Sequence, residues 1–444
     1  MTPAVQSARE RSLLASELED AWPVLSPEER LEGLRLLPHA DAEDLLLSLP
    51  ARDQADIILG MAPGERRSWM RLLPPDDAAD VIQEAPDTER EALLALLDDP
   101  TRHEVGALLA YAEDDAGGLM NPRYARLRPE MSVDEAITYL RRQARERLET
   151  IYYVYVLDAE QRLLGVVSFR ELFSAPPEKT VRDIMRTDVV TAPEEMDQEA
   201  LSKLFAETDF LAIPVVDAAR HVKGIVTVDD IVDVVQEEAT EDIQKIGGME
   251  ALDAPYLEVG FWSMVRKRAG WLAILFVGEM LTATAMGYFE HEIARAVVLA
   301  LFVPLIISSG GNSGSQASTL VVRSLALGEL KLRDWWRVIS REAFSGLVLG
   351  AILATIGLTR ILVWQGLFGA YGEHYILIAL TVASSLIGVV TWGTLAGSML
   401  PMILRRLGFD PASASAPFVA TLVDVSGLLI YFSVASVLLR GTLL

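Results

Sequence analysis

The chain has 444 residues, no cysteine and a formal net charge of −24, of which residues 1–268 carry −25 and residues 269–444 carry +1. The length suits several domains, and the lack of cysteine excludes disulfides and thiolate metal sites. The acidic balance argues against nucleic acid or anionic lipid as a partner and suits cation binding, although a solvated acidic surface also explains it.

Residues 1–119 predict an all-α domain. The first twenty residues are too polar for a signal peptide, so we expect the acidic half to stay where it is made. Apolar residues recur at helical spacing between prolines at 38, 50, 63, 74 and 86, which predicts a superhelix of short helical hairpins. Capping explains the acids Asp41 and Asp76, whereas Asp44 and Asp80 lie further into their helices.

Residues 120–236 contain an internal repeat. The run Val154–Asp158 recurs 59 positions later as Ile213–Asp217, and Leu164–Leu172 recurs at the same offset as Lys223–Ile231. Each copy predicts a helix, two β-rich runs joined by a polar turn and a second helix, so we expect one small α/β unit present twice.

The doubled pattern resembles a pair of CBS domains, which we place at 120–180 and 181–240. CBS pairs often bind adenine nucleotides, and the resemblance implies an ATP cleft lined by Tyr153, Arg170 and Phe210. A module that only packs, with an empty cleft, is an equally good interpretation.

A helix-prone acidic run follows between residues 237 and 258, and Gly247–Gly248 interrupts it. Glu238, Glu241 and Asp242 share one helix face, where like charges repel unless a cation neutralises them. A solvated, charged linker is the alternative. We place a connecting helix at 241–268, directly before the membrane half.

Residues 269–444 predict five membrane spans, because each apolar run approaches or exceeds the length needed to cross a bilayer. Lys and Arg gather in the loops before the first span and after the second and fourth, so the positive-inside rule places residues 1–268 in the cytoplasm of an inner-membrane protein. Five spans then put Leu444 outside. The predicted spans are Trp271–Phe289, Ile293–Leu327, Phe344–Trp364, Tyr375–Leu400 and Ala416–Leu439.

The second span contains a polar, Gly-rich run, Val303–Gln316. Non-helical backbone is tolerated at membrane depth only where protein or water satisfies it. The functional interpretation is a pore wall that offers carbonyl, hydroxyl and amide oxygens, with Pro304, Gly311 and Asn312 as candidates. The alternative is a close helix crossing through Gly310 and Gly314, and both can hold together.

The fifth span contains one charge, Asp424, among small residues in the run Pro417–Gly427. A carboxylate at membrane depth costs about 3 kcal/mol or more, so it normally faces a partner or a wet cavity. We interpret Asp424 as a cation site in a pore. The alternative is a structural carboxylate capped by neighbouring hydroxyls.

The order of domains, together with the runs Pro304–Gln316, Arg405–Pro411 and Pro417–Gly427, resembles the MgtE magnesium transporter family over essentially the whole chain. The resemblance implies a multi-domain fold with an all-α superhelical N-terminal domain, an α+β CBS-domain pair, a connecting (plug) helix and a five-helix transmembrane bundle. It also implies a homodimer whose pore lies on the two-fold axis between the second and fifth spans.

The resemblance further implies residue roles. Asp424 would be the selectivity carboxylate, with the Ala420 carbonyl beside it, and Asp410 a metal ligand on the cytoplasmic side. Ser315 stands where a second amide is expected, which leaves the pore role of that position open. The implied regulatory magnesium positions are Asp44, Asp76, Asp80, Gly118, Asp197, Glu199, Ala206, Asp209, Asp230, Asp233, Glu238, Glu241 and Asp242.

We therefore predict a magnesium-selective membrane channel or transporter, with no enzymatic activity, that closes when cytosolic magnesium binds its acidic domains. A transporter for another divalent cation is one alternative. The other is a nucleotide- or metal-sensing signalling protein that the spans merely anchor.

Overall fold

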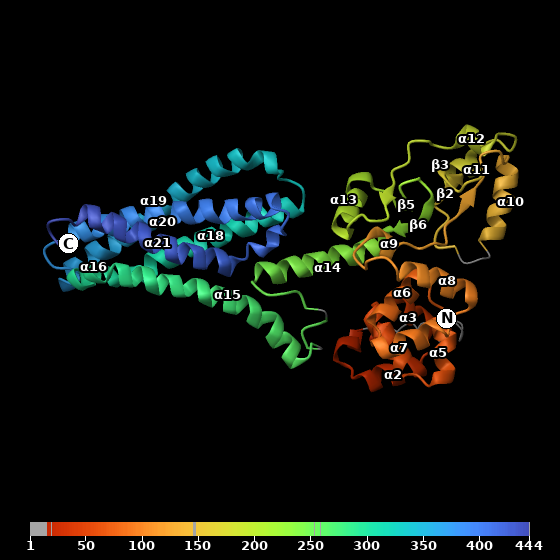
Figure 1. The fold of residues 1–444 in the computed structure, drawn as a ribbon, viewed down its shortest axis with the longest axis horizontal. Coiled ribbons are helices and arrows are strands. Elements are labelled where there is room, and N and C mark those ends of the chain that lie inside the picture. The colour runs from red at the N-terminus through yellow and green to blue at the C-terminus, as the bar shows by residue number, and fades with distance from the viewer. Residues whose placement is uncertain (1–15, 19, 145–147, 253, 258, 444) are drawn as a thin grey trace, which may run out of the picture. The chain divides into compact units, whose positions relative to one another are not determined.

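The structure is a computed structural model that describes residues 16–18, 20–144, 148–252, 254–257 and 259–443. The chain folds into two compact units, residues 1–235 and 236–444. Figure 1 shows that helices dominate both, and that strands occur only in the first.

The N-terminal part of the first unit is helical, as predicted. Four of the prolines that punctuate the sequence sit at helix N-caps, and Pro63 is the first residue of its helix, where a missing N–H costs nothing. The elements are η1 (Trp22–Val24), α2 (Pro27–Leu36), α3 (His39–Ser48), α4 (Ala51–Gly60), α5 (Pro63–Met70), α6 (Pro75–Glu84), α7 (Asp87–Leu94), α8 (Asp99–Leu108) and α9 (Ala116–Leu119).

The CBS-like region has two three-stranded sheets of the same topology, β1-β2-β3 and β4-β5-β6. In each sheet the first two strands are parallel and the last two antiparallel. The first copy comprises β1 (Arg126–Leu127), α10 (Val133–Gln143), β2 (Tyr153–Leu157), β3 (Leu163–Ser168) and α11 (Phe169–Ser174). After α12 (Val181–Ile184), the second comprises β4 (Ala192–Pro193), α13 (Gln198–Thr208), β5 (Ala212–Val216), β6 (Val222–Thr227) and α14 (Val228–Ile246).

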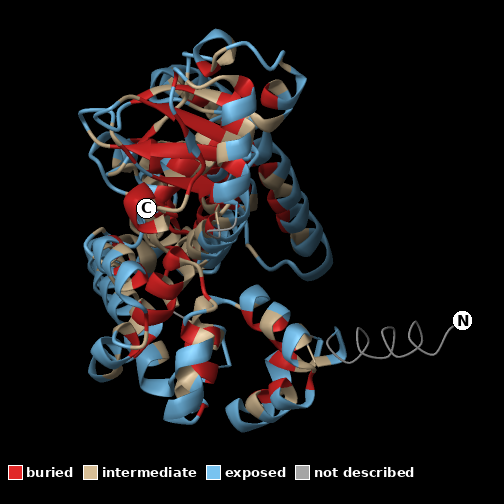
Figure 2. Ribbon diagram, turned by 90° about the vertical axis from the view of Figure 1, so that its right-hand side faces the viewer, coloured by how far each residue is buried: buried red, intermediate tan, exposed pale blue. Residues whose placement is uncertain are grey.

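The 59-residue offset predicted from the sequence holds in detail. A register shift falls between Val156 and Leu157 in the first copy and between Val215 and Val216 in the second. The strands are largely buried (Figure 2). One apolar core joins Ile58 of α4 and Val81 of α6 to Leu201 of α13 and Ile213 of β5, so the helical part packs on the second copy.

Helix α14 is much longer than its counterpart α11, because it continues through the acidic run to Ile246. Gly248 then adopts a φ of 76°, which favours glycine and ends the helix. The described residues between Gly248 and Gly260 form turns and irregular structure. Residues 253 and 258 of the acidic run lie outside the described residues.

Five helical segments of the second unit are long and apolar enough to cross a membrane, as the sequence predicted. They correspond to α15 (Phe261–Tyr288), α17 and α18 (Val297–Ala300 and Val303–Ala326), η2 and α19 (Leu332–Asp334 and Trp335–Phe368), α20 (Tyr375–Arg406) and α21 (Ala416–Leu438). Two short elements, α16 (Glu290–Arg295) and η3 (Pro411–Ser413), lie between them.

The second span is interrupted, as predicted, but its polar run is not. The break lies before the run, where Ala296 leaves helical geometry and α17 gives way to α18. From Val303 onward α18 is one continuous α-helix, so the backbone carbonyls of the run are engaged along the helix and side chains remain to line a pathway.

The glycines of the polar run serve a close helix crossing. A β-carbon on Gly314 would lie 2.8 Å from the carbonyl oxygen of Gly393 in α20, and one on Gly310 would lie 2.5 Å from Cγ1 of Val389. Helices α18 and α20 therefore approach at a distance that larger side chains would prevent.

Candidate functional site

The structure brings Gly311, Ala420 and Asp424 together where α18 crosses α21. A β-carbon on Gly311 would lie 3.5 Å from Cα of Ala420 and 3.9 Å from Oδ1 of Asp424. Asp424 is half-buried. All three residues are ones that the sequence assigned to the pore. Two separate helices, α18 (Val303–Ala326) and α21 (Ala416–Leu438), bring them side by side.

The hydroxyls nearest to Asp424 in sequence donate their hydrogen bonds to backbone carbonyls and not to Asp424. Thr421 Oγ1 donates to the Pro417 carbonyl at 3.0 Å, and Ser426 Oγ donates to the Leu422 carbonyl at 2.7 Å. Within the part of the chain that the structure describes, no side chain donates a hydrogen bond to the Asp424 carboxylate. This arrangement weighs against a capped structural carboxylate and leaves the oxygens available for a cation.

A polar stripe follows one face of α18. Pro304, Ser308 and Asn312 recur at every fourth position and are exposed in the single chain, whereas Ser313 and Gly314 are buried in the bundle. Ser315 is used otherwise, because its hydroxyl donates to the Ala416 carbonyl of α21 at 3.0 Å. The departure noted at position 315 therefore has a packing role.

The first span adds a second membrane carboxylate. Helix α15 crosses α21 closely, since a β-carbon on Gly278 would lie 2.9 Å from Cγ2 of Thr421. Glu279, the next residue, is exposed. Its position beside the crossing that carries Asp424 was not predicted from the sequence.

Asp410 begins the turn that leads into α21. Its Oδ1 accepts a hydrogen bond from the backbone N–H of Ala412 at 2.8 Å, and its Oδ2 accepts one from Nζ of Lys245 at 2.7 Å. Lys245 also pairs with Glu241, one turn earlier in α14. Partial burial opposes the charge on Lys245, but the hydrogen bonds to Asp410 and Glu241 outweigh it and raise the pKa of the amine above its ordinary value.

Among the predicted regulatory residues, Asp230 lies close enough to both Asp76 and Asp80 to influence their ionisation. Asp77 and Glu149, which the sequence analysis did not select, belong to the same group. We call these five carboxylates the acidic cluster. It joins α6 of the helical domain to both CBS copies, so it sits at a junction of domains.

The side chain of Asn121 binds two members of the acidic cluster. Its Nδ2 donates to Asp76 Oδ1 at 3.0 Å and to Glu149 Oε2 at 2.6 Å, and the residue is 1% exposed. Asp230 is held by the N-terminus of α14, where Thr227 donates its N–H and its hydroxyl to Oδ2. Asp76, Glu149 and Asp230 thus each have a hydrogen-bond partner within the protein.

Burial is the main cause of the raised pKa values in the acidic cluster, and repulsion between the carboxylates adds to it. The pKa of Asp76 is raised well above its ordinary value. The same effects raise the pKa of Asp80 to about 8, of Glu149 to about 7, and of Asp77 and Asp230 to about 6. Positive charge brought to this junction would relieve the repulsion.

Asp233 lies close enough to Asp77 and Asp230 to influence their ionisation, whereas the remaining predicted regulatory residues are more dispersed. Asp197 caps α13, Glu199 pairs with Lys203 at 2.6 Å, and Asp209 ends the same helix with a φ of 53°. Among the residues described, no three acidic or histidine side chains stand close enough to hold a metal ion. Gly118 is buried, Glu238, Glu241 and Asp242 are half-buried, and Asp44, Ala206 and Asp233 are exposed.

Two of the three predicted nucleotide residues face each other. The rings of Tyr153 in the first CBS copy and Phe210 in the second meet edge to face, with centroids 6.0 Å apart. Arg170 is exposed at the start of α11.

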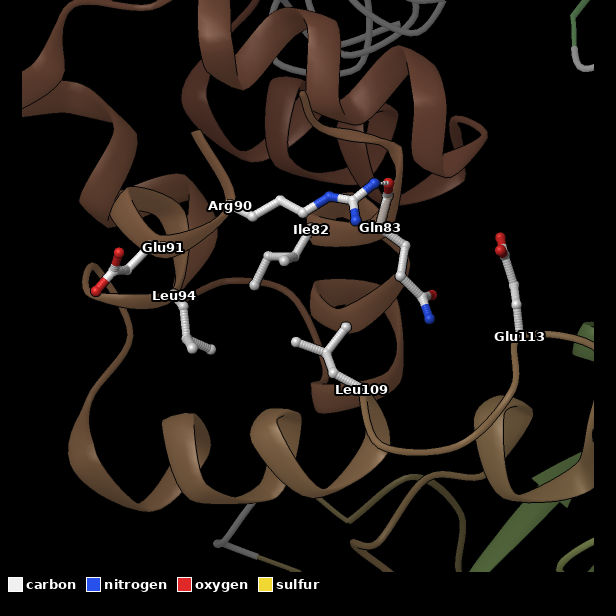
Figure 3. Close-up of a pocket in the computed structure, with 7 residues that line it drawn as sticks. All are labelled: Ile82, Gln83, Arg90, Glu91, Leu94, Leu109 and Glu113. Carbon is white, nitrogen blue, oxygen red and sulfur yellow. Dashed lines mark hydrogen bonds between the residues drawn. The ribbon is translucent and has the colours of Figure 1, made fainter. Parts of the chain in front are cut away.

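A surface pocket of about 470 Å³ lies elsewhere, in the helical domain. Figure 3 shows Ile82, Leu94 and Leu109 on its apolar side, with Arg90 and Glu113 at its edges. None of the predicted site residues lines it.

Three family models match the chain in order. The MgtE intracellular N domain matches residues 14–114, the CBS domain matches residues 116–178 and 181–237, and a divalent cation transporter model matches residues 303–434.

Known relatives match over most of the chain. The magnesium transporter MgtE of Thermus thermophilus is 43% identical over 95% of this chain and 92% of its own length. That of Enterococcus faecalis is 36% identical over 76% of this chain and 72% of its own length. A crystal structure of the cytosolic domain of the Mg2+ channel MgtE in complex with ATP is 40% identical, with a TM-score of 0.47, and covers 52% of this chain and 97% of that one. The chain belongs to the MgtE family of magnesium transporters.

Proposed function

We propose that this chain forms a magnesium-selective channel of the inner membrane, works as a homodimer and closes when cytosolic magnesium binds its acidic domains. The observation that carries the proposal is the half-buried Asp424, which has no donor to its carboxylate among the described residues and adjoins Gly311 and Ala420. An uncompensated acid in a membrane span needs a cation or a wet path.

The donor set suits magnesium. Mg²⁺ prefers oxygen ligands in octahedral geometry at about 2.0–2.1 Å and gives up its water reluctantly. Two Asp424 carboxylates that face each other across a dimer axis would hold a largely hydrated ion through its waters. Ala420 lies one helical turn before Asp424 in α21, and its carbonyl would orient those waters.

A second copy of the chain explains the exposed polar groups in the spans. Asn312 and Ser308 on α18 and Glu279 on α15 would otherwise meet lipid. A two-fold axis beside α18 and α21 would turn this surface into the wall of a pore. With the acidic half in the cytoplasm and five spans, the C-terminus would lie outside.

Gating would use the acidic cluster and α14. Carboxylates with raised pKa values repel when they ionise together, and a divalent cation would remove that repulsion and favour the compact arrangement. The acids on α14, Glu238, Glu241 and Asp242, would extend this response toward the membrane half. Each ion contributes only through its preference for the closed state.

The pore assignment is tested by replacing Asp424. We expect Asp424→Ala and Asp424→Asn to reduce magnesium uptake to background in a strain that lacks its own uptake systems, while Glu373→Gln, at an exposed position, keeps it. Uptake by Asp424→Ala at the wild-type rate would sink the pore and favour a membrane-anchored signalling protein. Competition of calcium, cobalt or manganese with the flux would identify the ion.

The gating is tested by limited proteolysis. We expect magnesium to slow cleavage between residues 237 and 258 in the purified, membrane-embedded protein, because metal binding would hold α14 and its following segment in place. Equal cleavage with and without magnesium would contradict the gating.

We also propose that the CBS pair binds an adenine nucleotide. The ring pair of Tyr153 and Phe210 supports this, because the two copies contribute one aromatic face each. Tyr153→Ala should abolish ATP binding measured by calorimetry. An unchanged affinity would favour a module that only packs.

A further inference from the structure

The end of α14 is seated against two membrane helices of its own chain. A β-carbon on Gly248 would lie 2.9 Å from Nε1 of Trp271 in α15 and 3.1 Å from Cγ of Pro417 in α21. Nε1 of Trp271 donates in turn to the Ser415 hydroxyl, the N-cap of α21, at 3.1 Å. The helix end is therefore packed at the start of the helix that carries Asp424.

Lys245 adds an ionic contact to this packing of the α14 end. Its Nζ lies 2.7 Å from Asp410 Oδ2, and the two side chains come from positions 165 residues apart. The second oxygen of Asp410 is already used by the Ala412 N–H. Both oxygens of Asp410 therefore already accept a hydrogen bond, one of them from a charged donor.

An ammonium resembles a bound cation in what it offers a carboxylate, since it carries positive charge and three donors and has no acceptor. We propose that Lys245 is a tethered cation, which occupies the Asp410 carboxylate and so takes the place that an ion would hold at this end of the pathway. Glu241, in the same helix, pairs with the same Nζ and so helps to orient the amine toward Asp410.

This inference rests on the proposed function, in which α14 takes part in closure, and on the predicted role of Asp410 as a metal ligand on the cytoplasmic side. It adds a specific group that would contribute to closure. The Lys245 ammonium would exclude the ion by occupying the Asp410 carboxylate, in addition to the steric block made by the helix end. The side chains of Lys245 and Asp410 are 30% and 37% exposed, so the pair is partly hydrated and exchangeable.

The contact itself is tested by acylating lysines of the full-length protein in lipid nanodiscs with saturating magnesium, and quantifying Lys245 by mass spectrometry against Lys331. We expect Asp410→Asn to speed labelling of Lys245 by about two- to fivefold, because the paired ammonium is released. Glu329→Gln, at an exposed position, should leave the rate unchanged. Equal labelling in wild type and Asp410→Asn would overturn the inference.

The role in closure is tested by magnesium flux into proteoliposomes, with magnesium varied on the side of the acidic domains. We expect Lys245→Gln to raise the half-inhibiting concentration by about two- to fivefold and Lys245→Arg, which keeps the charge, to stay near wild type. Wild-type inhibition in Lys245→Gln would overturn the inference. If magnesium on that side does not change the wild-type flux, the proposed gating is contradicted. The labelling experiment still tests separately whether Lys245 contacts Asp410.

Discussion

Asn121 holds two acids that would otherwise repel each other. Its amide nitrogen has two hydrogens, and these reach Asp76 from the helical domain and Glu149 from the first CBS copy. Because Asn121 is fully buried, neither hydrogen bond can be replaced cheaply by water. A neutral side chain thus performs part of the charge compensation that a metal ion would complete.

The residue-scale prediction concerns this amide. Asn121→Asp replaces the donor by a further acid, so we expect a loss of about 1–3 kcal/mol in the free energy of unfolding of the magnesium-free protein at neutral pH. The change is measured by denaturant unfolding. Gln236→Glu, which adds an acid at an exposed position of α14, is the control, and an equal loss in both variants would contradict the assignment.

The sequence identified Asp76, Asp80 and Asp230 through a family resemblance but not Asn121, Asp77 or Glu149. Asn121 lies 45 positions from Asp76, which it meets through the packing of two domains, and 28 positions from Glu149, which it meets through the folding of the first CBS copy. Helical spacing and motif matches report neighbours within one element. They carry no information about which side chains a domain junction brings together.

At the scale of elements, α18 has two faces with different tasks. Gly310 and Gly314 face α20 at close range, while Ser308 and Asn312 lie on the exposed side. The sequence allowed both a close crossing and a polar wall. The helix accommodates both because residues four apart share a face, whereas residues two apart, such as Ser308 and Gly310, lie on opposite sides. The sequence left open whether the backbone of the polar run is helical, because glycine content alone does not determine this.

The element-scale prediction compares two glycines of α18. An added β-carbon on Gly314 meets the Gly393 carbonyl at 2.8 Å and must separate the helices, whereas one on Gly311 meets Ala420 at an ordinary 3.5 Å. We expect Gly314→Ala to lower the free energy of unfolding by about 1–3 kcal/mol and Gly311→Ala to lower it by less than about 1 kcal/mol. Thermal unfolding in detergent measures both, and similar losses would contradict the crossing.

Regular patterns were the most predictable part of the architecture. The prolines of the helical domain mark helix starts, either as the N-cap, as Pro74 does, or as the first helical residue, as Pro63 does. The repeat preserved even the position of a strand irregularity. By contrast, the contact of Lys245 with Asp410 joins an acidic helix to a loop 165 residues away, and no local pattern reports it.

At the scale of the whole molecule, the first unit is assembled around acids that resist ionisation. The pKa of Asp80 is raised to about 8, of Glu149 to about 7 and of Asp77 to about 6. A carboxyl whose pKa is raised by folding costs stability at a pH above that value. The cost falls as pH drops through the folded pKa and ends near the ordinary value of about 4.

The whole-molecule prediction follows from this gain in stability as pH falls. In chelator, we expect the unfolding temperature of the first unit, within the full-length protein, to rise as pH falls from 8 to 6, and magnesium to raise it more at pH 8 than at pH 6. Asp80→Asn should flatten the pH dependence, because it removes the acid whose pKa is about 8. Differential scanning fluorimetry measures each curve. An unfolding temperature that drops over this range would contradict the cluster.

The division of labour on α18 has an evolutionary consequence. Its rotation about its own axis is set by glycines pressed against α20, on the side away from Ser308 and Asn312. Substitutions along the exposed stripe therefore leave the seating of the helix untouched. Descendants of this chain can therefore diversify the chemistry of the exposed stripe while inheriting the packing of α18 against α20 unchanged.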